Sequence, residues 1–240
     1  MKHDLENLKI GYHPILENYG YYIDKLDQNV LDEVSKVTNH VQNNFDTAIK
    51  HNNYLAGEIK HEYILSISPA IKNYMKGLVN KLEQKTGYSK RYYDERCNQY
   101  GNEITWTMDN MWINYQKKYE YNPIHEHEGL YSWVIWYKLP YIIEDEVKHS
   151  SKKQDPFGNS NNHCLNGYFS FIYSKDNKVV ADLLPVDNHY EGYVAMFPSD
   201  LHHQVHPFYS SDDYRITISG NIVNTRISYG EFFEENNVEG

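Results

Sequence analysis

The segment from Asn122 to Gly129 concentrates side chains that bind metals: it reads Asn-Pro-Ile-His-Glu-His-Glu-Gly. His125 and His127 alternate here with Glu126 and Glu128. Imidazole and carboxylate together suit iron, zinc, nickel or copper, and two histidines with one carboxylate are typical of oxygen-activating ferrous iron. Taken alone, the segment fits a polar surface loop equally well, because short His-rich runs are only compositional signals.

A second histidine run, Leu-His-His-Gln-Val-His, ends at His206 and follows an expected strand over 193–197. Side chains alternate along extended backbone, so His125 and His127 share one face, with the two glutamates on the other. By the same alternation His203 faces away from the histidine before it. Neighbouring strands of a barrel bring distant segments together. We therefore predict that His203 joins the first cluster as a third ligand.

A third informative segment covers 214–222 and alternates polar and apolar side chains. Arg215, Thr217 and Ser219 share one face, and two isoleucines occupy the other. On the inner face of a barrel, a guanidinium beside hydroxyls is suited to bind a carboxylate, because its planar fork reaches both oxygens. The alternative is an exposed edge strand with its arginine in solvent.

The pattern of apolar residues predicts helices first and strands later. Apolar steps of three and four residues predict an amphipathic helix over about 29–50. A second helix is expected from Ser68-Pro69 to Gly87, which suit its two ends. Edge strands are expected near 19–23. The remaining predicted strands are 104–108, 111–115, 131–138, 167–173, 179–184, 193–197 and 214–222. Many short strands without helical segments between them indicate a sandwich, barrel or jelly roll.

No linker or repeat divides the sequence, so we predict one domain over 1–240. Residues 1–100 form its helical N-terminal support, 101–225 its β core and 226–240 a C-terminal tail. The connection 141–166 is long and polar, which is typical of a functional lid or of a disordered segment, and we favour the lid.

Composition excludes several classes of protein. The net charge of -10 argues against binding duplex nucleic acid through the overall field. Cys97 and Cys164 lie far apart, so neither a disulfide framework nor a zinc ribbon is indicated. No segment approaches the roughly 18 apolar residues of a membrane span. We expect a cytoplasmic protein, in the host cell if the chain is viral, without a membrane partner.

Together, the motifs resemble the 2-oxoglutarate- and Fe(II)-dependent oxygenases, in which a His-x-ligand pair, a distant histidine and a later arginine occur in short strands. The likeness is greater to uncharacterised oxygenases common in marine bacteriophages, and it covers about residues 100–225. The motifs that carry it are Trp112-x-Asn114, Asn122-Pro-x-His125-x-His127-x-Gly129, Ser132-x-Val-Ile-x-Tyr137, Phe197-Pro-Ser199 with Leu201-x-His203, and Arg215-Ile-x-Ile-Ser-Gly-Asn221.

The resemblance implies a mainly β fold with flanking helices: a double-stranded β-helix core, jelly-roll or cupin-like, with the N-terminal helices packed on it. It implies Fe(II) and 2-oxoglutarate as cofactors with O2, and hydroxylation of a substrate with succinate and CO2 as co-products. His125 and His203 would bind iron. Arg215, helped by Thr217, would bind the far carboxylate of 2-oxoglutarate. The residues implied to line the pocket are Trp112, Asn114 and Tyr137.

The sequence departs from the family pattern at His127, where Asp or Glu is usual. Three readings stay open: His127 is itself the second ligand, Glu126 or Glu128 takes that position, or water or halide fills it. We favour His127, because alternation directs it to the same face as His125.

Other functions remain open. A cupin-like metal dioxygenase would not use 2-oxoglutarate, and a non-enzymatic metal-binding phage structural or host-interaction protein would catalyse nothing. A hydrolytic zinc site ranks lower, since no general base and nucleophile accompany the histidines. The fold class does not identify the substrate, which can be a small molecule or a protein.

Overall fold

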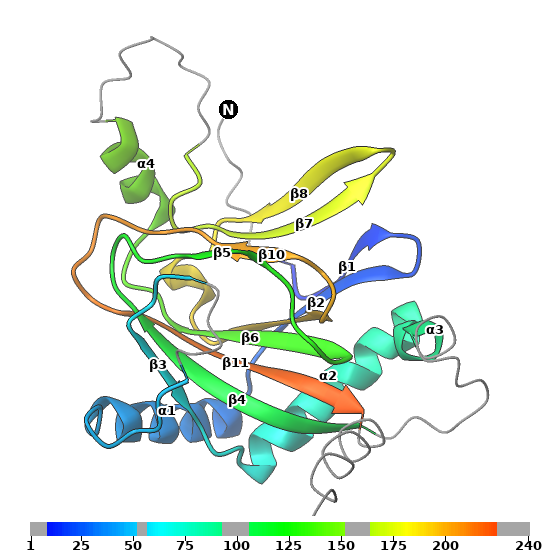
Figure 1. Ribbon diagram of the computed structural model, residues 1–240, viewed down its shortest axis with the longest axis horizontal. Helices are drawn as coiled ribbons and strands as arrows, with labels where there is room; N and C mark the ends of the chain where they lie inside the picture. The colour runs from blue at the N-terminus through cyan, green and yellow to red at the C-terminus, as the bar shows by residue number, and fades with distance from the viewer. Residues whose placement is uncertain (1–8, 52–56, 93–105, 152–163, 225–240) are drawn as a thin grey trace, which may run out of the picture.

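The computed structural model describes residues 9–51, 57–92, 106–151 and 164–224. Two antiparallel sheets lie face to face, and α1 and α2 cover the outer face of the larger one (Figure 1). The helices are α1 (Gln28–Gln42), α2 (Pro69–Thr86), α3 (Tyr88–Tyr92), α4 (Ile143–Ser151) and the short 3-10 helix η3 (Asn188–Tyr190). The strands are β1 (Gly11–Leu16), β2 (Tyr19–Lys25), β3 (His61–Ile64), β4 (Trp106–Gln116), β5 (Asn122–His125), β6 (Tyr131–Lys138), β7 (Phe169–Lys175), β8 (Lys178–Leu184), β9 (Tyr193–Pro198), β10 (His203–Val205) and β11 (Arg215–Asn224).

Strand order defines a jelly roll. The larger sheet runs β1-β2-β9-β6-β11-β4-β3 and the smaller sheet β5-β10-β7-β8. Strands β4 to β11 form the two four-stranded layers, and β1, β2 and β3 extend the larger sheet at its edges. The predicted fold class, a mainly β chain with flanking helices around a jelly-roll core, is confirmed. None of the helices in the described part of the chain combines the length and hydrophobicity that crossing a membrane requires.

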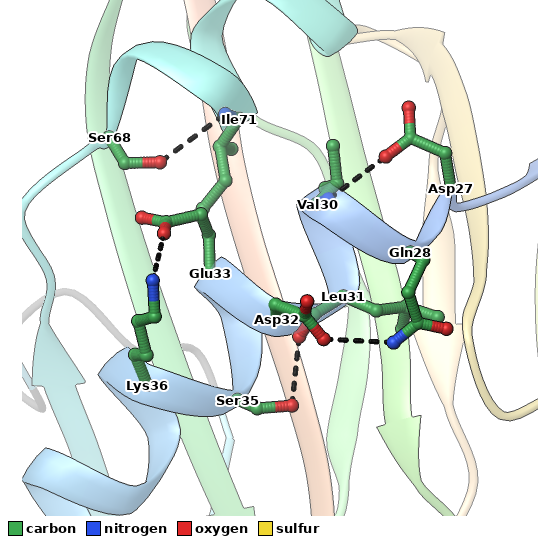
Figure 2. A network of polar contacts seen from close by, with 10 residues as sticks. All are labelled: Asp27, Gln28, Val30, Leu31, Asp32, Glu33, Ser35, Lys36, Ser68 and Ile71. Atoms are coloured by element: carbon green, nitrogen blue, oxygen red, sulfur yellow. Dashed lines mark hydrogen bonds and ion pairs between the residues drawn. The ribbon is translucent and has the colours of Figure 1, made fainter.

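Both long helices begin at residues that cap them. The Asp27 carboxylate accepts the Val30 N–H at 2.9 Å, and the Ser68 hydroxyl accepts the Ile71 N–H at 3.4 Å (Figure 2). These bonds satisfy backbone donors that have no partner within the first turn. Gly87 ends α2 with a φ of 55°, a conformation that glycine adopts without steric cost. Both predicted ends of α2 are therefore confirmed.

The helix α1 ends at Gln42, earlier than the predicted 50. Two asparagines follow it, and the Asn44 side chain donates to the His40 carbonyl at 2.7 Å. An amide side chain that bonds a carbonyl of the last turn competes with continuation of the helix. The residues after Gln42 that continue the apolar spacing therefore lie in turns and not in the helix.

Two predictions about the strands need correction, and one alternative is excluded. The segments 104–108 and 111–115 were expected as two strands, but β4 is continuous from Trp106, and 104–105 lie outside the described residues. Its register against β11 shifts near Asp109 and Asn110, so these polar residues mark a bulge in a strand and not a turn. In addition, β2 lies inside the larger sheet, between β1 and β9. β11 lies between β6 and β4, so the strand of Arg215 is not an edge strand.

The connection 141–166 contains a helix that the sequence reading did not predict. Helix α4 has three acidic residues in its first turn and Lys148 and His149 in its last, which complements the helix dipole. Its Glu146 is fully buried and accepts the N–H groups of Tyr209 and Ser210 at 2.9 and 2.8 Å. Residues 152–163 lie outside the described residues, so the lid remains a prediction.

Alternation along the strands divides the core in two. Residues such as Ile113 and Ile218 point from the larger sheet toward α1 and α2, where they join the largest apolar cluster. A second cluster, which includes Trp136, Phe171 and Phe197, fills part of the space between the sheets. The functional side chains must therefore lie on the inner face of the larger sheet or on the smaller sheet opposite.

Candidate metal centre and its cavity

Three histidines from two distant segments of the chain meet at the smaller sheet. His125 ends β5 and pairs in register with His203, the first residue of β10. His127 lies two residues beyond β5, and its backbone N–H donates to the Ser199 carbonyl at 2.9 Å. One ligand atom from each imidazole lies within 4.8 Å of the other two. The structure thus brings together the three residues that the sequence reading singled out as ligands.

Backbone carbonyls fix the proton positions of two of these rings. Nδ1 of His125 lies 2.7 Å from the Pro123 carbonyl, and Nδ1 of His203 lies 3.0 Å from the Leu201 carbonyl. A carbonyl oxygen only accepts, so each Nδ1 carries the proton and each Nε2 retains its lone pair. In His125 this Nε2 also lies 3.2 Å from the amide nitrogen of Asn122. Both rings present Nε2 as the ligand atom.

All three imidazoles are held neutral. Burial lowers the pKa of His125, and it lowers the pKa of His127 to about 3 with a smaller contribution from His125. The pKa of His203, which is 4% exposed, falls well below its usual value, again chiefly because of burial. Metal binding needs deprotonated imidazole, so a cation that bound here at neutral pH would not have to displace protons.

The neighbouring Glu126 and Glu128 border the same cavity, but neither belongs to the group of three histidines. Glu126 and Glu128 are exposed, and Glu126 Oε2 lies 3.6 Å from Nδ1 of the exposed His202. Among the described residues, no Asp or Glu joins the group formed by His125, His127 and His203. The alternation predicted for this segment is therefore seen in the burial pattern, and the donor set is three nitrogens.

A network of hydroxyl and amide groups supports the segment that carries the ligands. Ser132 Oγ lies 2.9 Å from Ser199 Oγ and donates to Asn221 Oδ1 at 2.8 Å, which joins β6, β11 and the loop after β9. Gly129 has a φ of 113°, and a Cβ there would lie 2.9 Å from the Ile222 carbonyl. The chain after His127 consequently needs glycine at this position.

The histidines line a cavity of about 800 Å³ between the two sheets. On the opposite wall, β4 and β11 present alternate residues of each strand to the cavity. Thr217 is in register with Asn114, and Arg215 with Gln116. The residues that line this wall include Trp112, Asn114, Gln116, Arg215, Thr217 and Ser219. Four predicted pocket residues, Trp112, Asn114, Arg215 and Thr217, thus border the same cavity as the histidines.

Arg215 is 2% exposed, and its guanidinium is fixed from three sides. Nε donates to Gln116 Oε1 at 3.0 Å, Nη1 to the Tyr141 hydroxyl at 2.9 Å and Nη2 to the His206 carbonyl at 2.7 Å. Burial, aided by the positive charge of Arg215, lowers the pKa of His206 to about 4. No carboxylate of the described residues forms an ion pair with Arg215. A buried charge needs compensation, so this wall is suited to an anionic ligand.

Tyr137 does not line the cavity, contrary to its predicted role. Alternation along β6 turns it toward α1, where its hydroxyl donates to Ser35 Oγ at 3.2 Å. Trp136, its neighbour, faces the cavity instead. The side chains that hold Arg215 were also missed, although Gln116 could have been found, because it has the same parity as Asn114. Glu62 in the cavity wall had no signal, since the four-residue strand β3 was not predicted.

Comparisons with known proteins found one matching family model and several similar solved structures. A family model described as "Putative 2OG-Fe(II) oxygenase" matches residues 110–221, which contain the three histidines and Arg215. The match covers just under half of the chain and shows a similarity to the 2-oxoglutarate- and Fe(II)-dependent oxygenases. That family implies Fe(II) and 2-oxoglutarate, with O2, as the cofactors. No curated protein matches the sequence.

Several solved structures are similar over most of the chain. A prolyl-4-hydroxylase of Pseudomonas putida is 13% identical with a TM-score of 0.49, over 84% of this chain and 91% of that one. A prolyl hydroxylase of Trichoplax adhaerens, in complex with a peptide fragment of hypoxia inducible factor, is 16% identical with a TM-score of 0.47, over 86% and 83%. An oxidoreductase of the 2OG-Fe(II) oxygenase family from Burkholderia pseudomallei is 11% identical with a TM-score of 0.43, over 85% and 84%.

Proposed function

We propose that the chain is an Fe(II)- and 2-oxoglutarate-dependent hydroxylase. In this proposal His125, His127 and His203 hold the metal, and Arg215 with Thr217 binds the far carboxylate of 2-oxoglutarate. The observation that carries it is the arrangement of one cavity. Three neutral imidazoles on one wall face a buried guanidinium on the other, and this guanidinium has no acidic partner among the described residues.

The donor set fits the metal. Imidazole suits iron, and the backbone carbonyls that fix Nδ1 of His125 and His203 orient both rings toward a shared centre. Ferrous iron with O2 and 2-oxoglutarate supplies the oxidation: one oxygen atom enters a C–H bond of the substrate, the other enters succinate, and CO2 leaves. The protein positions these groups and excludes water.

The second ligand is the residue that departs from the family pattern. With His127 as ligand the protein contributes no negative charge to the metal, whereas Asp or Glu would contribute one. His127→Asp restores the family pattern and is expected to retain metal and turnover, whereas His127→Ala loses both. Equal iron content in His127→Ala and the unmodified protein would exclude His127 as a ligand.

Arg215 is placed to hold the co-substrate in one orientation. Its three bonds to Gln116, Tyr141 and His206 fix the plane of the guanidinium, and Thr217 is the next inward-facing residue along β11. A carboxylate that binds there gains charge-assisted hydrogen bonds. The same contact directs the 2-oxo-acid end of the molecule across the cavity toward the histidines.

Anaerobic titration with Fe(II) and 2-oxoglutarate tests the proposal. We expect a weak visible charge-transfer band and, after O2 is admitted, succinate. Loss of 2-oxoglutarate binding in Arg215→Ala separates this function from a cupin-like dioxygenase, in which the variant has no such effect. An absence of the band, together with no succinate from any substrate pool, would contradict the proposal. Full folding after chelation, with no iron in the expressed protein, would favour a non-enzymatic role.

The proposal also includes the cellular compartment of the enzyme and the class of its substrate. The likeness to bacteriophage oxygenases and the absence of a disulfide framework support activity in the cytoplasm, of a host cell if the chain is viral. The substrate is a small molecule or a protein and not duplex nucleic acid, as the net charge of -10 suggests.

A further inference from the structure

Glu62 occupies a place in the cavity that the proposed function does not use. It lies on β3, the edge strand of the larger sheet, in register with Asn114 of β4, which is itself in register with Thr217 of β11. The three residues form a row across the sheet, and all of them line the cavity. Glu62 is 2% exposed. A carboxylate is thus buried two strands from the strand that carries the proposed co-substrate site.

No cationic side chain compensates this carboxylate among the residues that the structure describes. Glu62 Oε1 accepts from Nδ1 of His51 at 3.0 Å, and burial lowers the pKa of His51, so this ring is a neutral donor. Asn114 lies in register with Glu62 on the neighbouring strand, and its side chain partly offsets the effect of burial on the pKa of Glu62. Burial raises the pKa of Glu62 to about 7, because hydrogen bonds from neutral groups replace only part of its hydration. A ligand cation would remove this penalty.

Asn114 adds a second acceptor at the same place. Its Oδ1 is buried and has no hydrogen-bond partner within the described part of the chain. Because Asn114 and Glu62 are in register and line the same wall, this oxygen and the carboxylate are two acceptors at one place in the cavity. Buried acceptors of this kind are normally satisfied, so they indicate a ligand group with several N–H donors.

The walls beside Glu62 are apolar and lead toward the histidines. Ile59, Ile64 and Trp112 line this side of the cavity. The Trp112 ring centroid lies 5.6 Å from that of His51 and 5.6 Å from that of His127. The rings of His51 and His127 are therefore separated by at most twice that distance. An indole face attracts a cation, and aliphatic walls accommodate a methylene stem.

We propose that Glu62, positioned by His51 and Asn114, recognises the cationic head of the substrate, a primary ammonium or guanidinium on an aliphatic stem that extends along Trp112 toward the metal site. This inference rests on the proposed function and specifies its substrate class. One C–H bond of the stem becomes C–OH, with O2 and 2-oxoglutarate as the oxidants and succinate and CO2 as products, and the cationic head is unchanged. The net charge of -10 favours the approach of such a substrate.

L-Arginine and L-citrulline form a matched pair of probes, because guanidinium and urea differ in charge and hardly in shape. Calorimetric titration of the full chain, with and without Fe(II) and 2-oxoglutarate, should show arginine binding at least about tenfold more tightly. L-Lysine and L-norleucine extend the comparison to an ammonium. The same side chains within a blocked tripeptide distinguish a free amino acid from a protein residue as the natural source. Equal affinities for all charged and neutral partners would overturn the proposal.

Substitution of Glu62 tests whether it is the residue responsible. Glu62→Gln keeps the shape and should reduce the preference for arginine over citrulline to near unity. Glu58→Gln is the matched control: it removes the same charge from the same segment, but Glu58 is exposed, so the preference should persist. If Glu62→Gln does not fold, Glu62→Asp, which withdraws the charge by one methylene, should show a reduced preference. An unchanged preference in the folded Glu62 variant would overturn the assignment.

The two proposals fail separately. The charge-transfer band with Fe(II) and 2-oxoglutarate, together with succinate formation, tests the oxygenase function, and the ratio of affinities tests the cation subsite. A preference for arginine with neither the band nor any succinate would retain the subsite and overturn the oxygenase. Succinate formation without a preference for arginine would retain the oxygenase and overturn the cation subsite.

Discussion

The two faces of the larger sheet differ although the same strands build them. On the helix side, Ile113 and Ile218 are 0% exposed and pack against α1 and α2. On the cavity side, the adjacent residues Asn114 and Thr217 border open space together with Arg215. In a simple sandwich the space between the sheets is the main apolar core. In this protein the largest apolar cluster instead lies between the larger sheet and the helices α1 and α2. The inner face of that sheet is therefore available for polar side chains that border the cavity.

The comparison implies that alternate residues of these strands have different roles: one set stabilises the fold and the other set binds ligands. Full burial of one aliphatic side chain stabilises the fold by roughly 1.5–3 kcal/mol, and such residues fill the helix side. The buried polar groups of the cavity side add little net stability and cost free energy wherever they lack partners. Substitutions on the helix side should therefore change stability, and substitutions on the cavity side should change ligand binding.

The largest effect is expected from His203→Ala. The variant removes one of three metal donors, so iron content and succinate formation should fall by more than about 100-fold. The imidazole also packs against Phe169 and Phe197, so far-UV circular dichroism and urea denaturation must confirm that the variant is folded. His202→Ala removes an exposed neighbour and serves as the control. A His203→Ala protein that still binds iron with its original stoichiometry would exclude this ligand.

The next effect is on stability. Ile218→Ala creates a cavity on the helix side and should lower the free energy of unfolding by about 2–5 kcal/mol. Urea denaturation measures this change, and titration with 2-oxoglutarate at a temperature where the variant is folded should give an unchanged affinity. A large loss of affinity with little loss of stability would contradict the separation of the two faces.

Alternation explains how much of this site the sequence could predict. Arg215, Thr217 and the isoleucines between them were assigned to opposite faces correctly, because strand geometry fixes the parity of side chains over a short segment. The same rule turned His127 toward His125. Tyr137 was predicted to line the pocket from the family motif alone. The alternation of side chains along β6 instead turns its ring toward α1.

Other features required information that is not local. The partners of Arg215 come from β4, from the segment between β6 and α4, and from the loop after β10, and only the fold brings them together. The strand β3 is too short for alternation to distinguish it from a loop, so Glu62 escaped notice. A bulge in β4 resembled a turn, because Asp and Asn are common in both.

The free energy of unfolding of the metal-free protein should depend on pH, because the cavity side buries ionisable groups whose pKa values differ between the folded and unfolded states. His127 and His203 have depressed pKa values in the folded state, so their contribution to stability is present above about pH 6.5 and is lost as the pH falls. Glu62 has a folded pKa raised to about 7, so its contribution is present below about pH 4.5 and is lost as the pH rises through 7. The two histidines outweigh the single carboxylate.

Between pH 7 and 5 the free energy of unfolding should therefore decrease by about 2 kcal/mol, as measured by urea denaturation in the presence of a chelator. Glu62→Gln removes the opposing contribution and should steepen the decrease. Stability that rises as the pH falls through this range would show that the histidines are accessible to protons in the folded protein.

The smallest expected effects come from two adjacent residues of β6, Trp136 and Tyr137, whose side chains lie on opposite faces of the larger sheet. Tyr137→Phe removes a 3.2 Å hydrogen bond to Ser35 on the helix side and should lower the free energy of unfolding by no more than about 1 kcal/mol. The KM for 2-oxoglutarate should not change, because the ring does not border the cavity. Trp136→Phe alters the adjacent residue, which does border it, and should change that KM. If Tyr137→Phe raised the KM and Trp136→Phe left it unchanged, the parity of β6 would be opposite to that described, and the division between a stabilising face and a binding face would fail at this strand.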